Sequence, residues 1–470
     1  MVGAASTGTA GSVREENWYR TVWRWHFYAG LFTVPFILWL SVTGGIYLFK
    51  PQIEAWLDRP YAGLADPAAA LPPSDLAARA QAAVPGSILH RYVLPESPGD
   101  ARQIVVGKGA EETRVYLQPA SGEVLKTVGE QDRFMRVMFY LHGELMAGRW
   151  GSTLVELAAS WAIIMLLTGL FLWWPRGAKR LGGVLYPRLR LGRRAFWRDI
   201  HAVTGIWVSL MALFLISSGL PWAKNWGTYL RDVREWTGTT SQSQDWFVSS
   251  REEAMQRAKL DAGARSALTG HEGHSGMEGM AMPTPAIASL KPLDRVVPTA
   301  ASLDLPGPVE ISPPTGQGTL WQVISNTPNR PQRVTLQIEG MNGEVTSRED
   351  FADRHWIDRT VGYGIAAHEG ALFGPANQLL SLATVIGLVM LALSSIAMWW
   401  KRRPHGMIGV PPPQGRLRHS WLLVALTVLL GFLVPLFGLS LGAVVLTEIL
   451  WLRRNRKIAT QLGLRVVARR

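Results

Sequence analysis

The stretch "LHGELMAG", residues 141–148, stands directly ahead of a long apolar run at 152–174. A second stretch, "AHEGALFG" at 367–374, stands directly ahead of another apolar run at 376–400. Around the two histidines, the spacing of aspartate, arginine, glycine and tryptophan agrees without a gap over about 45 residues. The matched pairs are Asp132 and Asp358, Arg133 and Arg359, His142 and His368, Gly148 and Gly374, Trp173 and Trp399, Trp174 and Trp400, and Arg176 and Arg402. This agreement indicates an internal repeat.

Long apolar runs decide the class of protein. They cover 27–49, 152–174, 202–222, 376–400 and 421–451. Because about 20 apolar residues cross a bilayer as a helix, the first four runs each predict a membrane span. The chain also holds 21 tryptophans, a residue that collects at membrane–water interfaces. The sequence therefore predicts a multi-pass membrane protein.

The distribution of charge sets the expected topology. The net charge is +13, and basic residues gather at 175–198, 401–418 and in the C-terminal tail, beside the apolar runs. The positive-inside rule explains this pattern without a nucleic-acid partner. The N-terminus and the basic segments are then cytoplasmic, and the segments 51–140 and 223–366 lie outside. The last apolar run has basic residues at both ends, which fits either a short hairpin or one long kinked helix.

The two outer segments show similar patterns. Helices are expected at 72–84 and 293–303, and strands at 102–107, 113–118, 320–325 and 332–337. A turn followed by a further strand is expected in "PASGEVLKT" at 119–127, and "EGMNGEVTSR" at 339–348 parallels it. "VYLQPASGEV" and "VTLQIEGMNGEV" differ by a two-residue insertion. We expect each segment to form its own small α+β domain, and we expect His90 at the surface of the first.

Four histidines take repeat-related positions at the ends of membrane helices. His26 and His201 share the pattern H-x-x-x-G, with a further glycine 18 residues on. Two copies pointing the same way have an axis along the membrane normal, as in parallel repeats. That symmetry brings His26 opposite His201 near the inner face, and His142 opposite His368 near the outer face.

Paired histidines in a membrane suggest a metal centre. Neutral imidazole is the commonest metal ligand, and two imidazoles can hold a haem iron from both sides. The absence of cysteine excludes covalent attachment through C-x-x-C-H and predicts two b-type haems. Gly30, Gly205, Gly44 and Gly219 are the candidate glycines that leave room for the macrocycle. A proton relay and a histidine-lined metal path stay open as alternatives.

A histidine- and methionine-rich stretch, "HEGHSGMEGMAM", lies at 271–282 in the second outer segment. Thioether and imidazole ligands suit copper, so this stretch is a candidate metal site, and an unstructured loop is the alternative. Its candidate ligands are His271, His274, Met277, Met280 and Met282.

The motifs together resemble the PepSY-associated transmembrane family, which includes inner-membrane ferric-siderophore reductases. The resemblance rests on "WRWHFYAG", "LHGELMAG", "WWPR", "RDIHAVTG", "AHEGALFG" and "WWKRRP" and covers roughly 20–450. It implies periplasmic PepSY domains, membrane-embedded b haems with His26, His142, His201 and His368 as axial ligands, and reduction of ferric iron in siderophores.

The sequence thus predicts an α-helical integral membrane protein with α+β periplasmic domains, built from two parallel-repeat units plus a C-terminal helix or hairpin. The expected function is a di-haem b inner-membrane reductase that passes electrons from a cytoplasmic or quinol donor to a periplasmic ferric siderophore or other metal substrate. A copper-binding protein, cupric reductase or metal transporter and a non-catalytic PepSY scaffold are the alternatives. The expected segments are a disordered cytoplasmic tail (1–19), membrane segments (20–50, 141–175, 196–222, 367–400, 420–452), PepSY-like domains (51–140, 223–366), cytoplasmic basic loops (176–195, 401–419) and a cytoplasmic basic tail (453–470).

Overall fold

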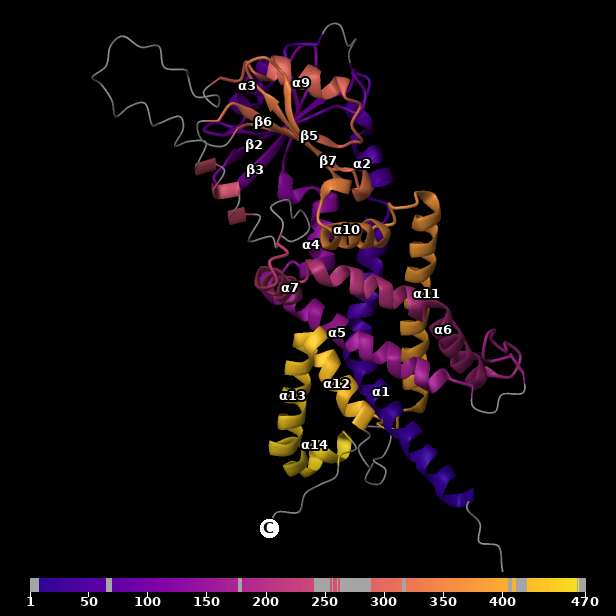
Figure 1. The fold of residues 1–470 in the computed structure, drawn as a ribbon. Helices are drawn as coiled ribbons and strands as arrows, with labels where there is room; N and C mark the ends of the chain where they lie inside the picture. Colours follow the sequence, from indigo (N-terminus) through magenta and orange to yellow (C-terminus); the bar gives the residue numbers. More distant parts are fainter. Residues whose placement is uncertain are drawn as a thin grey trace, which may run out of the picture. The chain divides into compact units, whose positions relative to one another are not determined.

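The computed structural model (Figure 1) describes residues 8–64, 70–175, 180–240, 254–255, 257–259, 261–262, 289–314, 318–404, 408–410, 421–462 and 464. The chain folds as two compact units. The helical unit contains Met1–Gly45, His142–Val233 and Leu380–Arg470, and the sheet unit contains Ile46–Leu141 and Arg234–Leu379. Each unit therefore collects segments that are far apart in the sequence.

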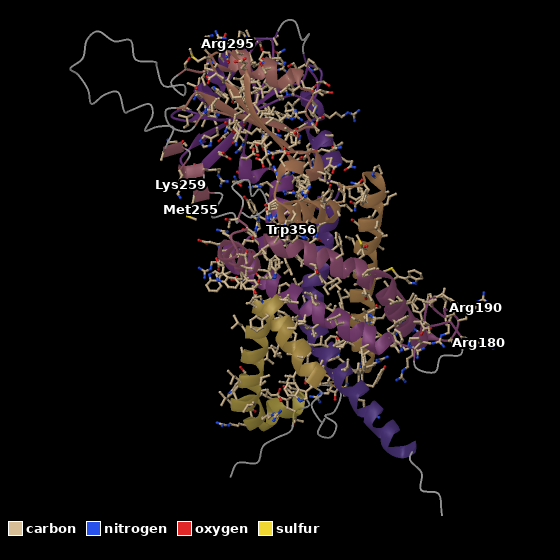
Figure 2. All side chains as sticks on the ribbon, viewed as in Figure 1. Arg180, Arg190, Met255, Lys259, Arg295 and Trp356 are labelled. Atoms are coloured by element: carbon tan, nitrogen blue, oxygen red, sulfur yellow. The ribbon has the colours of Figure 1, made fainter. Side chains whose placement is uncertain are left out.

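Long apolar helices make up most of the helical unit. Among the described residues, five helical stretches are long and apolar enough to cross a membrane, namely Tyr19–Tyr47, Gly148–Trp173, Arg193–Trp222, Pro375–Arg402 and Pro435–Arg454. They belong to helices α1 (Gly8–Tyr47), α5 (Gly148–Trp173), α6 (Arg193–Gly219), α11 (Pro375–Arg402) and α13 (Pro435–Leu450). Arg180 and Arg190 lie in the connection between α5 and α6 (Figure 2). Helix α1 begins at Gly8, inside the segment 1–19 for which disorder was expected.

The membrane segments expected at 141–175 and 367–400 each contain a helix break. Helix α4 (Phe134–Glu144) ends before α5 begins, and Leu145 and Met146 adopt positive φ angles of 51° and 55° between them. Helix α10 (Trp356–His368) likewise ends before α11, with Gly370 at φ 75°. The two histidine motifs are therefore helix–turn–helix joints, and each histidine lies on the short helix before the joint.

The last apolar run is a hairpin rather than one long helix. Helix α12 (Trp421–Leu433) ends at Val434, and Pro435 opens α13. A Cβ atom built on Gly438 would lie 3.0 Å from the Cα of Gly431, so the two helices touch backbone to backbone. The hairpin packs against α5, where the indole Nε1 of Trp161 donates to the Ser440 hydroxyl at 3.1 Å. A short helix, α14 (Arg456–Gln461), follows.

The sheet unit is built on one eight-stranded antiparallel sheet, in the order β4-β3-β2-β1-β5-β6-β7-β8. Helices α3 (Pro73–Ala83) and α9 (Leu293–Ser302) share one buried apolar core with both halves of the sheet. The strands are β1 (Ile88–Val93), β2 (Arg102–Lys108), β3 (Glu111–Leu117), β4 (Val124–Gly129), β5 (Val309–Ser312), β6 (Leu320–Ser325), β7 (Val334–Glu339) and β8 (Val345–Asp350). Helices α2 (Lys50–Asp58) and α10 also belong to the sheet unit, whereas α4 and α7 (Lys224–Trp236) each have residues in both units.

The two outer segments do not form two separate domains. Strand β1 pairs with β5, where Tyr92 lies opposite Ile311, so the half-sheets join into one. Neither β1 nor β5 was among the strands predicted from sequence. Because an unpaired strand edge exposes a row of N–H and C=O groups, pairing the two edges satisfies both halves at once.

The two outer hairpins match in length, and the expected two-residue insertion does not lie in the turn. The Gln118 N–H donates to the Glu123 carbonyl at 2.8 Å, and the Glu339 N–H donates to the Glu344 carbonyl at the same distance. Gly122 and Gly343 hold the matching left-handed position of each turn, at φ 69° and 78°. Gln118 therefore corresponds to Glu339 rather than to Gln337, so the predicted match of "VYLQ" with "VTLQ" is wrong by two residues.

Candidate functional site: histidine pair and charged cavity

The structure brings His26 of α1 and His201 of α6 together inside the helical unit. Their ring centroids are 6.3 Å apart, and the ring planes make an angle of 76°. Both histidines stand near the start of a long apolar stretch. Because an ionisable side chain within a membrane helix is costly, such a pair is a candidate functional site.

Each ring is held through its Nδ1 atom by the neighbouring helix. The His26 Nδ1–H donates to the Met165 carbonyl at 3.0 Å, and the Thr168 hydroxyl lies 3.2 Å away. The His201 ring meets α11 in the same manner. Its Nδ1 lies 3.2 Å from both the Leu391 carbonyl and the Ser394 hydroxyl.

These contacts fix the tautomer of both rings. A carbonyl oxygen can only accept, so Nδ1 carries the proton and Nε2 keeps a free lone pair. Among the described residues, none donates to or accepts from Nε2 of His26 or His201. This is the arrangement of a metal-binding histidine, whose second nitrogen is oriented by a carbonyl or a hydroxyl.

The candidate glycines Gly30 and Gly205 face the helices that hold the two rings, α5 and α11. A Cβ atom on Gly30 would meet the Met165 sulfur at 3.9 Å, and one on Gly205 would meet Leu391 at 3.7 Å, both ordinary contacts. The glycine that abuts His26 is Gly169, where a Cβ atom would lie 3.0 Å from Cε1. No repeated spacing pointed to Gly169, because the repeat has Ser395 at the equivalent position. Gly219 ends α6.

His142 is held close to α1. Its Nδ1 lies 3.1 Å from the Thr43 hydroxyl. The next residue, Gly44, is in contact with the ring, since a Cβ atom there would lie 2.9 Å from Cε1. Because Gly44 has no side chain, the imidazole of His142 packs directly against the backbone of α1.

Helix α10 ends at His368, which lies in the sheet unit. The helix is anchored by a buried ion pair in which the Arg234 guanidinium donates to both carboxylate oxygens of Asp358, at 2.6 and 2.9 Å. Asn377 donates to the Ala367 carbonyl at 2.9 Å, next to His368. His142 and His368 belong to different units, so their pairing stays a prediction. The candidate copper ligands at 271–282 lie outside the described residues.

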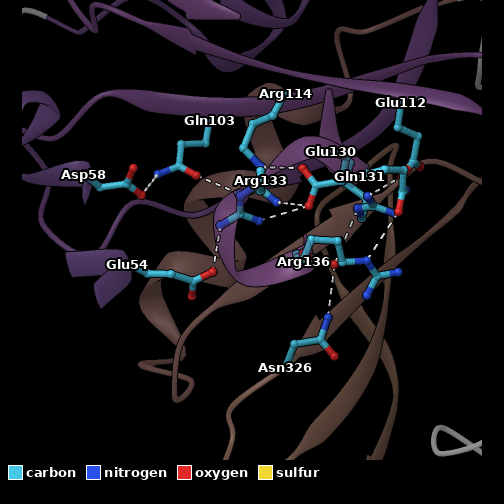
Figure 3. A network of polar contacts seen from close by, with 12 residues as sticks. Glu54, Asp58, Gln103, Glu112, Arg114, Glu130, Gln131, Arg133, Arg136 and Asn326 are labelled. Atoms are coloured by element: carbon cyan, nitrogen blue, oxygen red, sulfur yellow. Dashed lines mark hydrogen bonds and ion pairs between the residues drawn. The ribbon is translucent and has the colours of Figure 1, made fainter. Parts of the chain in front are cut away.

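A charged network lies in the sheet unit, and sequence reasoning missed it (Figure 3). Arg114 binds Glu130 through two nitrogens at 2.8 and 2.9 Å, and Arg133 bridges Glu130 and Glu54 at 3.0 and 3.1 Å. Burial favours the neutral acid, but the two arginines outweigh it and lower the pKa of Glu130 to about 2. The carboxylate is therefore charged throughout the physiological range.

The network continues to the joint between the half-sheets. Glu112 accepts from the Nδ1 of His90 and from Arg91, both at 2.8 Å, and these partners lower its pKa against the effect of burial. His90 is only 9% exposed, so the expectation of a surface residue was wrong. The members lie on separate strands and helices with no common spacing, which is why no sequence pattern revealed them.

A comparison with protein-family models agrees with the long apolar helices. A family model described as the PepSY-associated TM region matches residues 23–402. No curated protein matches the chain. The matched region includes all four repeat-related histidines and both halves of the sheet, and it ends before the C-terminal hairpin. The chain is therefore a multi-pass membrane protein that belongs to the PepSY-associated TM region family.

Proposed function

We propose that this protein is a di-haem b membrane reductase, in which His26 and His201 hold one haem and His142 and His368 hold the other. The observation that carries the proposal is the His26–His201 pair, with both Nδ1 atoms engaged and both Nε2 atoms without a partner among the described residues. The function would be to pass electrons from a cytoplasmic or quinol donor to a ferric siderophore or other metal substrate.

The spacing of the rings supports an ion between them. At the usual metal–imidazole distance of about 2.0–2.1 Å, an ion on the line between two Nε2 atoms leaves the ring centroids about 6 Å apart. The centroids of His26 and His201 are 6.3 Å apart. The distance between the two ring centroids therefore supports a site in which His26 and His201 would hold one ion together.

The ligand set supports haem rather than a bare ion. No group of three or more histidine, cysteine, aspartate or glutamate side chains is placed to hold a metal within the described part of the chain. Two histidines alone leave the remaining coordination positions to a group that brings its own ligands, as a porphyrin does. With no cysteine in the chain, such a haem would be held without covalent attachment, and when bound it supplies one-electron transfer.

Symmetric contacts support the two-copy organisation. His26 and His201 are each oriented by a carbonyl and a hydroxyl on a second helix. The two carbonyls belong to Met165 and Leu391. These two residues are separated by the same interval in the sequence as His142 and His368. We infer two parallel repeats related about the membrane normal. By the positive-inside rule, the basic connections support an N-terminus in the cytoplasm and outer segments in the periplasm of a bacterial inner membrane.

The test is a dithionite-reduced minus oxidised spectrum of the purified chain, with haem counted per polypeptide. Two b haems with low-spin bis-histidine spectra are expected. His26→Ala and His201→Ala should each lose one haem, because both substitutions remove a ligand of the same site. His355→Asn, which keeps a capping side chain at the start of α10, is the matched control. A haem-free chain after haem-replete expression would refute the proposal.

A further inference from the structure

The connection between α5 and α6 brings exposed apolar and basic side chains together. From 175 to 198 the sequence contains eight arginine and lysine residues and no aspartate or glutamate. Within the described part of this connection, which begins at 180, the exposed large apolar side chains are Leu181, Leu185, Tyr186, Leu189 and Leu191. Exposed apolar side chains that cluster in this way mark an interaction surface. The proposed haem sites do not involve this surface.

Contacts with the two flanking helices hold the connection in place. The Trp173 indole, at the end of α5, donates to the Val184 carbonyl at 3.0 Å. The buried Asp199 carboxylate of α6 accepts from two nitrogens of the Arg188 guanidinium, at 2.7 and 3.1 Å. The exposed apolar side chains are therefore presented by a folded segment.

The connection runs back alongside the apolar part of α6. The Trp207 indole donates to the Leu185 carbonyl at 3.0 Å. Trp207 follows Asp199 by eight residues, or about 12 Å along the helix axis, and lies inside the apolar run that begins at 202. Leu185 therefore contacts α6 within the stretch that is apolar enough to cross a membrane, deeper than the level at which Arg188 binds.

Basic side chains with no acidic partner among the described residues stand next to these apolar groups. Arg190, which Figure 2 labels, lies in the connection, and Arg193 and Arg194 open α6. All three are exposed and form no hydrogen bond or ion pair with a residue that the structure describes. The neighbouring arginines that do have a partner both bind the same aspartate. The first three thus leave positive charge beside an apolar surface.

The combination of charge and apolar area narrows the class of partner. A soluble acidic protein could neutralise the arginines, but it would not cover leucine side chains that lie beside the lipid-facing part of a membrane helix. An anionic phospholipid satisfies both requirements. Its phosphate accepts charge-assisted hydrogen bonds from guanidinium groups, and its acyl chains cover the apolar side chains. Basic clusters next to a membrane helix attract anionic lipids for the same reason.

We propose that the connection between α5 and α6 is a binding site for an anionic phospholipid. Arg190, Arg193 and Arg194 bind the phosphate group, and the acyl chains lie against Leu189 and Leu191. The contacts with α5 and α6 preform this surface before the lipid arrives. Binding requires neither haem nor electrons, so its test is separate from that of the proposed function.

The absence of cysteine allows a site-specific test on the full chain. Leu189→Cys, labelled with the apolar fluorophore bimane, is reconstituted in phosphatidylcholine vesicles. These vesicles contain either phosphatidylglycerol or phosphatidylcholine with brominated acyl chains, which quench the label on contact. Each arginine near an anionic surface contributes about fivefold to the affinity, so a preference of about tenfold to 100-fold for phosphatidylglycerol is expected at this label. The preference should fall as salt is added.

Arg190→Gln should lower the preference about fivefold. Replacing Arg193 and Arg194 by glutamine as well should abolish it. The matched control is Arg454→Gln, which removes the same charge from an exposed position after the C-terminal hairpin and should leave the preference unchanged. A label at Leu439→Cys on α13, a position 72% exposed, should be quenched equally by both lipids. This second label also reports that each variant is still embedded in the membrane.

Three outcomes would overturn the lipid site. One is equal quenching of the label at 189 by the two lipids, and another is a preference that survives the loss of all three arginines. The third is no quenching at 189 by either lipid while the label at 439 is quenched, because the connection would then face water and a soluble acidic partner. If the purified chain lacks haem but keeps the preference at 189, the proposed function fails and the lipid site stands.

Discussion

At the scale of single residues, the orientation of an imidazole decides what it can bind. His26 and His201 both direct Nδ1 to a carbonyl that also accepts from a hydroxyl, Thr168 in one case and Ser394 in the other. The hydroxyl and the carbonyl together hold the ring, and Nε2 is the atom that would bind the proposed haem iron. The hydroxyl residues are therefore positioning residues for the proposed haem site.

Replacing Ser394 by alanine should leave the haem count unchanged and raise the midpoint potential of the haem at His26 and His201. The lost contact makes His201 a less basic ligand, which favours the ferrous state. A shift of roughly 30–60 mV is expected, up to a factor of ten in the one-electron equilibrium. Potentiometric titration measures it. Ser395→Ala is the control, since that hydroxyl donates to Ala392 instead, and an equal shift there would count against the assignment.

Replacing Gly44 by alanine should displace His142 and remove one haem, because the new methyl group would lie 2.9 Å from the imidazole. Haem per chain and the reduced spectrum are the measurements. Gly143→Ala makes the same change beside His142 but has nothing within 4 Å of its Cβ position. Loss of haem in both variants would point to a helix effect rather than to crowding of the ring.

At the scale of elements, helix joints and close helix contacts decide where the chain turns. The C-terminal hairpin depends on the touching glycines Gly431 and Gly438. Pro435, at the start of α13, has no N–H to donate and so favours a break in the helix there.

Gly438→Val should separate α12 from α13 and speed amide exchange across 421–450. Overpacking costs about 1–3 kcal/mol, so local opening should become roughly tenfold more frequent. Hydrogen exchange followed by mass spectrometry measures this. Gly442→Val is the matched control, since its Cβ position is open. Unchanged exchange in Gly438→Val would show that the two helices do not pack through these glycines.

The buried network around Glu130 predicts acid sensitivity of the sheet unit. The pKa of Glu130 is about 2 in the folded chain, against 4.5 for a free glutamate. A lowered pKa stabilises the folded state above the unfolded pKa, and this stabilisation is lost as pH falls from about 4.5 toward 2.

The thermal midpoint of the sheet unit should therefore fall steeply in that window, as measured by circular dichroism. Glu130→Gln should have a lower midpoint at neutral pH and a flatter dependence on pH, because the titrating group is gone. Glu344→Gln, on an exposed turn, should keep the full dependence. A parent-like slope in Glu130→Gln would assign the acid sensitivity to other carboxylates.

At the scale of the whole molecule, strands from two distant segments form one folding unit. The joint is the β1–β5 pair, and Ile311 on β5 is fully buried there. Two independent domains would respond separately to damage, whereas one continuous sheet should respond as a whole.

Ile311→Ala should destabilise the sheet unit by about 2–5 kcal/mol, the usual cost of a cavity in a core. Amide protection should fall in β1–β4 as well as in β5–β8, followed by hydrogen exchange. Leu320→Ala, at a position 39% exposed, should change protection little. Loss confined to β5–β8 would show that the two halves fold independently.

The sequence by itself determined the membrane class, the repeat-related histidines, the family and six of the eight strands, because apolar length and period-two patterns are local properties of the chain. Tertiary structure alone decided the β1–β5 joint, the hairpin, the contact of Gly169 with His26 and the charged network of the sheet unit. These features depend on which distant segments meet. The arginines and glutamates of that network lie on separate elements, so their partners are set by the fold, and no spacing in the sequence could reveal them.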